Sequence, residues 1–579
     1  MNTLVIVLIA AVVLFGAYMV YGRWLAKKWG IAPKAETPAV KYNDGKDFVP
    51  TNGWTVFSHQ FSSIAGAGPV TGAIQAAAFG WLPVLLWILI GGVFFGAVTD
   101  FGALYASVKN EGKSMGMIIE KYIGKFGRKI FLLFCWLFTL IVIAAFADMV
   151  AGTFNAYTVN ADGATVLSAA AKTNGSAGMV SIMFMVFAVV FGLIQKKLNL
   201  SGWKEAVVGI AFIVASFVIG NFCPIILGKN AWSYITFVYI FFAAVMPMWL
   251  MKQPRDYMTT FMFIAMIVGA ALGLVVAHPS MNLPVYTGFN NAKLGTMFPI
   301  LFVTVACGAV SGFHSLVSSG TSSKTVENEK DMLKVGYGAM VLESLLAVLA
   351  LCVAGAAATN GALPAKTPFA IFSSGVAGFF EMFGVPVHFA TVFMTMCVSA
   401  LALTSLDAVA RIGRMSFQEL FSVDDMEHAE GWRKLLCNTY FSTIVTLVCG
   451  FILTKIGYAN IWPLFGSANQ LLSALVILTL CVFLKVTGRS NKMLFPPLII
   501  MLCVTFTALV QRTIAMVKAI KLAASVTIPA GQTSWGSVFI ANGLQLIIAI
   551  LLIVLGVIIV VNSVKSYAKS EKNSEKTAA

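Results

Sequence analysis

The sequence has 579 residues, of which 59% are hydrophobic and only 11% are charged. A soluble chain carries about 25% charged residues, so the 39 basic and 23 acidic side chains are too few to cover a soluble globule. These numbers exclude a soluble enzyme, a disordered protein and a fibre. The formal charge of +16 comes from short basic clusters between long apolar segments. That pattern is typical of a membrane protein with several crossings and not of a nucleic-acid-binding protein.

Apolar segments long enough to cross a membrane follow one another along the whole chain. A transmembrane helix needs about 20 apolar residues, and this criterion predicts an all-α membrane protein with about fifteen crossings. A short apolar segment around 367–382 leaves room for an additional re-entrant piece. The predicted crossings are 2–22, 58–79, 82–107, 130–155, 178–195, 205–222, 232–251, 257–277, 296–319, 335–358, 387–410, 437–454, 460–484, 493–511 and 537–561.

The basic residues predict the orientation of these crossings. With the N-terminus outside and the C-terminus in the cytoplasm, 31 of the 39 lysines and arginines fall on the cytoplasmic side. This agrees with the excess of positive charge that cytoplasmic loops carry. The segments 109–129 and 411–436 are then cytoplasmic, and Lys252 and Arg255 are counted in a cytoplasmic loop. The polar tail 565–579 is predicted to be disordered.

Two crossings contain glycine or proline near mid-span, where a membrane helix is normally regular. They are the second, with FSHQFSSIAGAGPVTG at 57–72, and the ninth, with CGAVSGFHSLVSSGTSSK at 307–324. Each also fits the small-residue pattern of close helix packing, which is the alternative interpretation. Because the two crossings run in opposite directions, the pair favours discontinuous helices in an inverted-repeat secondary transporter.

Discontinuous helices expose backbone groups in mid-membrane, where a substrate can bind them. The amino ends of half-helices attract an anionic group, and serine hydroxyls add neutral polar contacts. The candidate substrate-binding residues are Ala65, Gly66, Gly68, Ser311, Gly312, His314, Ser315 and Ser318. His314 either titrates in the cavity or closes the gap in a broken helix as a neutral side chain.

Four segments resemble the carbon starvation protein CstA family. They are FSSIAGAGPVTG, CGAVSGFHSLVSSGTSSK, LTSLDAVARIGR and WPLFGSANQLLSAL, and the resemblance spans residues 50–485. It implies a peptide or pyruvate transporter of the bacterial inner membrane, used in starvation, with a LeuT-like inverted repeat of five plus five helices. The implied divisions are 1–57, a first half 58–222, two inserted helices in 223–295, a second half 296–484, C-terminal helices in 485–564, and the tail 565–579.

Acidic side chains inside crossings are costly, so each indicates a transport pathway or a paired site. The candidate coupling residues are Glu343, Asp148, Asp100 and Asp407. Glu343 has no charged partner within a helical turn, which makes it the leading proton carrier. Asp407 shares a helix face with Arg411 and Arg414, so an intrahelical ion pair is the alternative there.

A coupling cation has a second candidate site. In LeuT-like transporters, adjacent hydroxyls on the eighth core helix and carbonyls of the first one hold a sodium ion. The resemblance therefore implies a Na⁺-type site at Thr404, Ser405 and the carbonyl of Ala65. Asn469 and Gln470 are interpreted as interhelical hydrogen-bonding residues. No cofactor is expected beyond a coupling H⁺ or Na⁺.

The sequence thus predicts a secondary active importer of a small organic nutrient, a symporter for short peptides or pyruvate. The alternatives are a membrane sensor or receptor and a Na⁺-coupled amino-acid-type transporter. An enzyme is not expected, because no catalytic constellation such as HExxH is present. The expected partners are the small-molecule substrate and membrane lipid, without nucleic acid, and the oligomeric state stays open.

Overall fold

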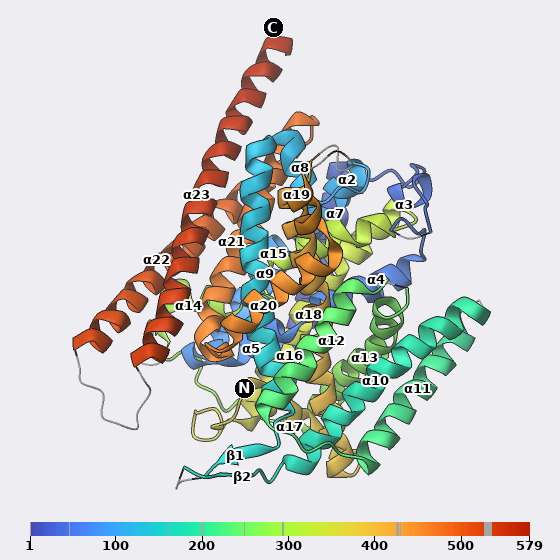
Figure 1. Cartoon of the computed structure of the whole chain (residues 1–579), viewed down its shortest axis with the longest axis vertical. Coiled ribbons are helices and arrows are strands. Elements are labelled where there is room, and N and C mark those ends of the chain that lie inside the picture. Colours follow the sequence, from blue (N-terminus) through green and yellow to red (C-terminus); the bar gives the residue numbers. More distant parts are fainter. Residues whose placement is uncertain are drawn as a thin grey trace.

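The structure is a computed structural model that describes residues 2–578 apart from 46, 161–162, 199, 201, 248, 292–293, 424–427, 429 and 526–534. It consists almost entirely of helices (Figure 1), as the composition predicts. The helices of the first part are α1 Thr3–Ala17, α2 Arg23–Trp29, α3 Pro38–Lys41, α4 Gly53–Ile64, α5 Ala67–Ala76, α6 Trp81–Gly91, α7 Ala97–Lys109, α8 Met115–Tyr122 and α9 Lys125–Thr153.

The remaining elements continue this pattern, with two small hairpins in the loops. The helices are α10 Ala171–Leu198, α11 Trp203–Phe222, α12 Lys229–Val245, α13 Lys252–Ala277, α14 Met297–Thr304, α15 Gly312–Gly320, α16 Ala339–Ala357, α17 Pro368–Met382, α18 Val387–Phe421, α19 Gly431–Cys437, α20 Thr439–Thr454, α21 Tyr458–Val486, α22 Phe495–Ser525 and α23 Trp535–Ala578. The antiparallel strand pairs are β1 Tyr157–Val159 with β2 Thr165–Leu167, and β3 Asn290–Asn291 with β4 Gly295–Thr296.

Within the described residues, eleven helices are long and apolar enough to cross a membrane. A twelfth crossing results if α19 and α20, which meet at a bend of 65°, form one span. The chain is therefore a multi-pass membrane protein. The other crossings predicted from the sequence correspond to α12, which has 17 residues, and to the two broken pairs α4–α5 and α14–α15. These elements are too short for the same test, so the count of fifteen stays a prediction.

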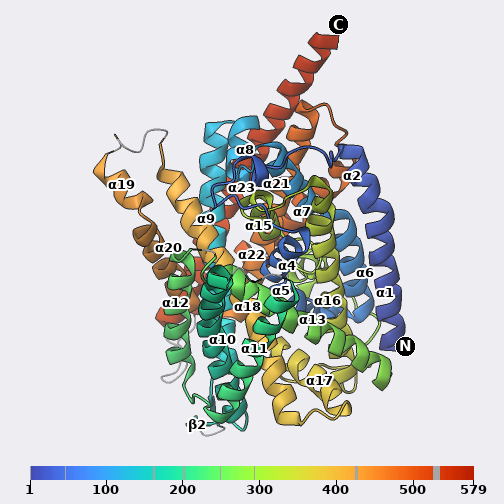
Figure 2. The same ribbon diagram turned by 90° about the vertical axis from the view of Figure 1, so that its right-hand side faces the viewer.

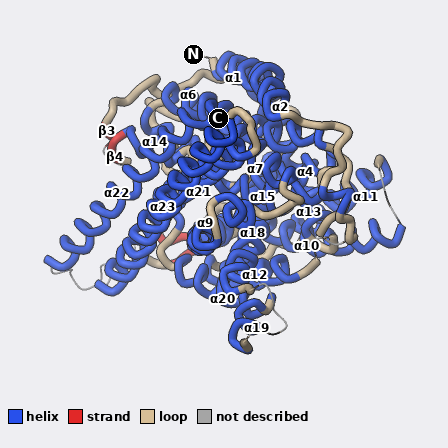
Figure 3. The backbone as a smooth tube through the Cα atoms, turned by 90° about the horizontal axis from the view of Figure 1, so that it is seen from above, coloured by secondary structure: helices blue, strands red, loops and turns tan. Residues whose placement is uncertain are grey.

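The bundle has a buried centre and two peripheral helix pairs. Figure 3 shows α9, α15, α18 and α21 in the middle, with α22 and α23 on one side and α11 on the opposite side. Figure 2 shows α2, α8, α19 and the C-terminus toward one end of the bundle, and β2 and α17 at the other. The segments predicted to share a membrane face therefore lie at the same end.

Two helices continue past their predicted ends. The helix α18 extends to Phe421, eleven residues beyond the predicted crossing, because residues 411–421 contain few helix breakers. The helix α23 extends through residues 565–578, which the sequence predicts to be disordered. Alanine, lysine and glutamate in this tail are strong helix formers, so polar composition alone was a poor guide.

Candidate functional site

The first broken crossing consists of α4 and α5, separated by Ala65 and Gly66. A Cβ on Gly66 would lie 2.5 Å from Ser405 Oγ, so glycine allows Ser405 to approach the break closely. Ser405 Oγ donates to the Ser63 carbonyl oxygen at 3.3 Å, which satisfies an acceptor next to the break. Gly68 belongs to the first turn of α5 together with Pro69. Proline is tolerated there because the first turn has no helical N–H bond to lose.

The second broken crossing consists of α14 and α15, which residues 305–311 separate. Asn469 on α21 caps the second half: its Oδ1 accepts from the Phe313 N–H at 3.1 Å and its Nδ2 donates to Ser311 Oγ at 3.0 Å. Gln470 Nε2 donates to the Phe302 carbonyl of α14 at 2.7 Å. The helix α21 thus supplies the hydrogen bonds that lipid cannot provide. The interhelical role predicted for Asn469 and Gln470 is confirmed.

The two breaks lie directly against each other. A Cβ on Gly68 would overlap the Cys307 side chain, and a Cβ on Gly308 would lie 3.4 Å from Pro69 Cα. Glycine at these positions lets the two backbones approach closely. Both discontinuous helices predicted from the sequence are present, and they meet at their breaks.

Three titratable side chains meet beside the second break, and none has any exposed surface: Asp100 on α7, His314 on α15 and Glu343 on α16. His314 Nδ1 lies 3.0 Å from Asp100 Oδ2, and His314 Nε2 lies 3.3 Å from Glu343 Oε2. One imidazole therefore lies between two carboxylates. In the described part of the chain, neither carboxylate has a lysine or arginine as an ion-pair partner. We call these three residues the sealed cluster.

Each carboxylate of the sealed cluster follows an irregular helical turn. A π-helical turn at Gly92–Gly96 precedes α7, and another at Leu333–Gly338 precedes α16. Such turns are frequent at functional sites. Gly336 in the second turn packs against the backbone of Phe101, where a Cβ would lie 2.7 Å from Phe101 Cα. The resulting close approach of the two crossings brings their carboxylates to the same histidine.

A second charged group joins the first broken helix to α13. His59 Nδ1 on α4 lies 2.9 Å from Asp256 Oδ2, and Lys252 Nζ lies 3.0 Å from the same oxygen. Lys252 Nζ also donates to Ser63 Oγ at 3.0 Å, two residues before the break. Lys252 and Asp256 are buried within the bundle. Lys252 therefore belongs to the interior of the protein and not to the cytoplasmic loop predicted for it.

The same group extends to α12 and α18 through Arg255, which is also buried and not in a loop. Arg255 forms an ion pair with Asp407, and Tyr239 donates to Asp407 Oδ2 at 2.7 Å. Arg411 instead donates to the carbonyl oxygens of Ala243 and Met246 at 3.0 and 2.8 Å. The intrahelical ion pair considered for Asp407 is therefore wrong, because a cation on α13 takes its place. We call His59, Tyr239, Lys252, Arg255, Asp256 and Asp407 the compensated network.

Two other predicted sites have different surroundings. Asp148 pairs with Lys229 Nζ at 2.7 Å and accepts from the Tyr458 backbone N–H at 3.0 Å, at the start of α21. Thr404 donates to the Ala400 carbonyl in its own helix at 2.9 Å, whereas its neighbour Ser405 reaches the first break. Of the predicted pair of hydroxyls, only Ser405 contacts the carbonyls near Ala65.

The eight predicted substrate-binding residues surround the two breaks, and all are buried. Several of them are occupied by contacts within the protein. Ser318 Oγ accepts from Gln60 Nε2 at 2.9 Å, and Gly312 lies against the backbone of Asn469 and Ser473. Two cavities open toward opposite ends of the bundle, with volumes of about 1040 and 320 Å³. Within the described part of the chain, neither is lined by any of the eight residues.

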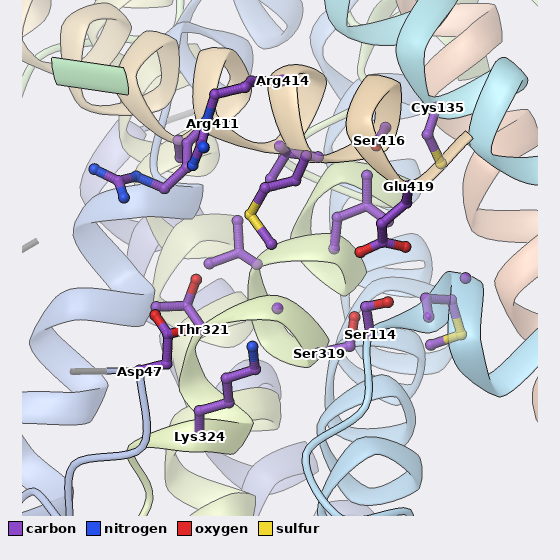
Figure 4. Close-up of a pocket in the computed structure, with 18 of the residues that line it drawn as sticks. Asp47, Ser114, Cys135, Ser319, Thr321, Lys324, Arg411, Arg414, Ser416 and Glu419 are labelled. Carbon is purple, nitrogen blue, oxygen red and sulfur yellow. The ribbon is translucent and has the colours of Figure 1, made fainter. Parts of the chain in front are cut away.

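The smaller cavity is strongly charged (Figure 4) and was not predicted. Its lining includes Lys324, Arg411, Arg414 and, opposite them, Glu419. These residues were assigned to loops, because charges at the end of an apolar segment usually mark the membrane boundary. The signals that could have revealed the cavity are the glutamate five residues after Arg414 and the mixed charges KQPRD at 252–256, of which Lys252 and Gln253 also line it.

Comparisons with known proteins agree with the sequence resemblance. The peptide transporter CstA of Bacillus subtilis is 30% identical over 99% of this chain and 98% of its own length, and that of Escherichia coli is 29% identical over 85% and 78%. The pyruvate/proton symporter BtsT of E. coli is 38% identical over 61% of this chain and 49% of its own length.

Similarity to solved structures is weaker. The structure of MhsT in complex with L-phenylalanine has a TM-score of 0.48 and 10% identity, covering 88% of this chain and 99% of that chain. This similarity is too low to assign a fold. The family model for the carbon starvation protein CstA, in contrast, matches residues 2–363 and 354–508. The chain therefore belongs to the carbon starvation protein CstA family.

Proposed function

We propose that this protein is a secondary active transporter that imports a small organic nutrient, a short peptide or pyruvate, together with protons across the bacterial inner membrane. A role in carbon starvation is part of the proposal. The observation that carries it is the sealed cluster beside the second break. A carboxylate sealed away from water is costly unless it is paired or carries a proton.

The sealed cluster has the composition that a proton carrier needs. Two ionised carboxylates and a neutral imidazole carry two negative charges without a fixed cation, so proton uptake by the cluster lowers the cost of burial. His314 lies on the half-helix that follows the break. If α15 moves when access alternates between the two sides of the membrane, the contacts of His314 change, and proton affinity changes with them. We therefore propose Glu343, with Asp100 and His314, as the coupling site.

The substrate side of the proposal rests on the relatives and on charge. The relatives are named as transporters of peptides and of pyruvate with protons, and both kinds of molecule carry a carboxylate. The breaks at Ala65–Gly66 and 305–311 stay the proposed central site, and the cavity with Lys324, Arg411 and Arg414 lies on the proposed route to the cytoplasm. The N-terminus outside and the C-terminus inside complete this topology.

The inverted repeat is part of the proposal, and contacts favour a particular pairing of helices. His59 on α4 contacts Asp256 on α13, as Phe313 on α15 contacts Asn469 on α21. In the first half, α12 is hydrogen-bonded to α18 through Tyr239. In the same way, α20 of the second half is hydrogen-bonded to α9, because it accepts from Trp136 at 3.1 Å. These parallels support α12 and α13 as the last two helices of the first half. The two inserted helices are then the peripheral pair α10–α11, and not the helices in 223–295 that the resemblance implies.

A sodium-coupled, amino-acid-type transporter is the second candidate, favoured by the Ser405 contact near the first break. The Lys252 ammonium argues against it, because it already lies 3.0 Å from Ser63 Oγ beside the same carbonyls. A fixed cation at this distance repels a sodium ion.

Uptake of labelled alanyl-alanine and pyruvate into proteoliposomes tests the proposal. We expect an inward proton gradient, in sodium-free buffer, to drive accumulation of at least one of them above its external concentration. A sodium gradient alone is not expected to do so. Accumulation driven only by sodium, or none above protein-free liposomes, contradicts proton symport of these substrates.

A further inference from the structure

The cavity in Figure 4 has opposite charges at its two ends. It has a volume of about 320 Å³ and lies between α9, α15 and α18. Figure 4 shows Arg411 and Arg414 toward one end and Glu419 toward the other with Ser114 and Ser319, while Lys324 lies below them near Asp47 and Thr321. Apolar side chains such as Leu132, Val317 and Met415 complete the lining.

The basic end has unused hydrogen-bond donors. One terminal nitrogen of Arg411 donates to the carbonyl oxygens of Ala243 and Met246. One terminal nitrogen of Arg414 donates to Gln418 Oε1 and to Thr439 Oγ1, both at 3.3 Å. The Nε atoms of both arginines are buried without a hydrogen-bond partner in the described structure. Asp47 is the acidic side chain at this end, and the basic side chains in the lining are Lys252, Lys324, Arg411 and Arg414. This end therefore retains positive charge and free N–H groups for a carboxylate.

The acidic end has unused acceptors. Glu419 Oε2 and Ser114 Oγ are buried without a hydrogen-bond partner among the described residues. Among the described residues, Arg128 is the cation paired with Glu419: its NH2 group lies 3.9 Å from Glu419 Oε2, and its NH1 group already donates to Glu120 Oε2 at 2.7 Å. The Glu419 carboxylate can therefore accept hydrogen bonds from an ammonium group.

We infer that this cavity is a second substrate site that selects molecules with a carboxylate at one end and an ammonium at the other. Arg411 and Arg414 hold the carboxylate, and Glu419 is the specificity-determining residue for the ammonium. A simple monocarboxylate fills only the basic end and leaves Glu419 unpaired, which costs binding free energy. The inference rests on the proposed transport function, because it assigns the site to the route of the substrate to the cytoplasm.

Binding to the purified full-length protein, measured by calorimetry, tests this assignment with four probes. They are alanyl-alanine, its N-acetyl form, its C-terminal amide, and pyruvate. We expect alanyl-alanine to bind about tenfold more tightly than any other probe, since each missing charge removes a charge-assisted hydrogen bond. Glu419→Gln should lose about tenfold for alanyl-alanine and leave the N-acetyl form unchanged. Arg414→Gln should weaken alanyl-alanine but not its amide.

Controls separate this site from a general loss of structure. Glu111→Gln changes an exposed carboxylate outside the cavity and should leave all four affinities unchanged. Glu419→Asp should keep the preference for the free ammonium if Glu419→Gln does not fold. Equal binding of the capped and free peptides, or equal weakening of both by Glu419→Gln, overturns the inference. That result would leave the proposed proton-driven uptake unaffected. Selective binding without any gradient-driven uptake would instead refute the proposed function and leave the binding site unaffected.

Discussion

The two broken helices carry histidines in opposite electrostatic settings. His59, before the first break, belongs to a network in which Lys252 and Arg255 face Asp256 and Asp407. His314, after the second break, lies between Asp100 and Glu343, without a lysine or arginine partner in the described part of the chain. The compensated network is neutral when all four charged groups are ionised, whereas the sealed cluster is not.

This difference separates a structural role from a coupling role. Buried ion pairs that balance each other hold helices together and have no need of a proton. A cluster with two carboxylates and no fixed cation gains stability by binding protons, so its charge can follow the movements of the protein. The proposed coupling therefore belongs to the second broken helix, and the attachment of α4 to α13 and α18 belongs to the first.

The largest expected effect is that of Glu343→Gln. The amide keeps the size of the side chain but cannot exchange a proton, so accumulation driven by a pH gradient should be lost. Exchange of labelled for unlabelled substrate at equal pH needs no net proton movement and should persist. Both rates can be measured in the same proteoliposome preparation. Concentrative uptake by this variant would show that Glu343 is structural.

Arg255→Gln should instead lower stability. It leaves Asp407 with the Tyr239 hydroxyl alone and removes a cation beside Asp256. Loss of one partner of a buried ion pair costs about 3–5 kcal/mol, which thermal unfolding in detergent can detect. The double variant R255Q/D407N should recover a large part of this loss. Unchanged unfolding of Arg255→Gln would contradict a structural role for the compensated network.

Asn469→Ala is expected to have an intermediate effect on stability. It removes the acceptor of the Phe313 N–H and the donor to Ser311, and burial leaves those groups without water. An unpaired buried polar group costs about 1–3 kcal/mol. Ser473→Ala, one turn further on α21, is a matched control because its hydroxyl has no hydrogen-bond partner within the described structure. Equal melting temperatures of the two variants would show that Asn469 does not cap the broken helix.

The smallest expected effect is that of Asp148→Asn. Its partner Lys229 is 46% exposed, and an ion pair with an exposed partner contributes about 0–1 kcal/mol. The amide oxygen can still accept from the Tyr458 N–H. Proton-driven uptake should therefore stay close to that of the wild type, which also makes this variant a carboxylate control for Glu343. Loss of uptake would transfer the coupling role to Asp148.

Local sequence predicted the features that local chemistry determines. Glycine and proline at 66–72 and 308–312 revealed both breaks, because such residues are rare within a membrane helix unless protein or water satisfies the freed backbone. Asn469 and Gln470 were interpreted as interhelical residues because amide side chains within a membrane span favour hydrogen bonds between helices. The isolation of Glu343 within its own helix also indicated a special environment.

Contacts between distant segments were beyond the sequence. His314 and Asp100 are 214 residues apart, and periodicity within a helix says nothing of such a pair. Lys252 and Arg255 were placed in a loop because charge usually marks the membrane boundary, yet Asp256 and Asp407 allow both to be buried. The continuation of α18 to Phe421 was missed for the same reason, and with it the cavity between Arg414 and Glu419.

Proton movement by the wild-type protein tests the central claim most directly. A pH-sensitive dye inside proteoliposomes, in sodium-free buffer, reports protons that enter when alanyl-alanine or pyruvate is added outside. We predict acidification of the interior upon addition of the transported substrate, and none with Glu343→Gln. Substrate entry without acidification, or acidification that persists in Glu343→Gln, would contradict coupling through the sealed cluster.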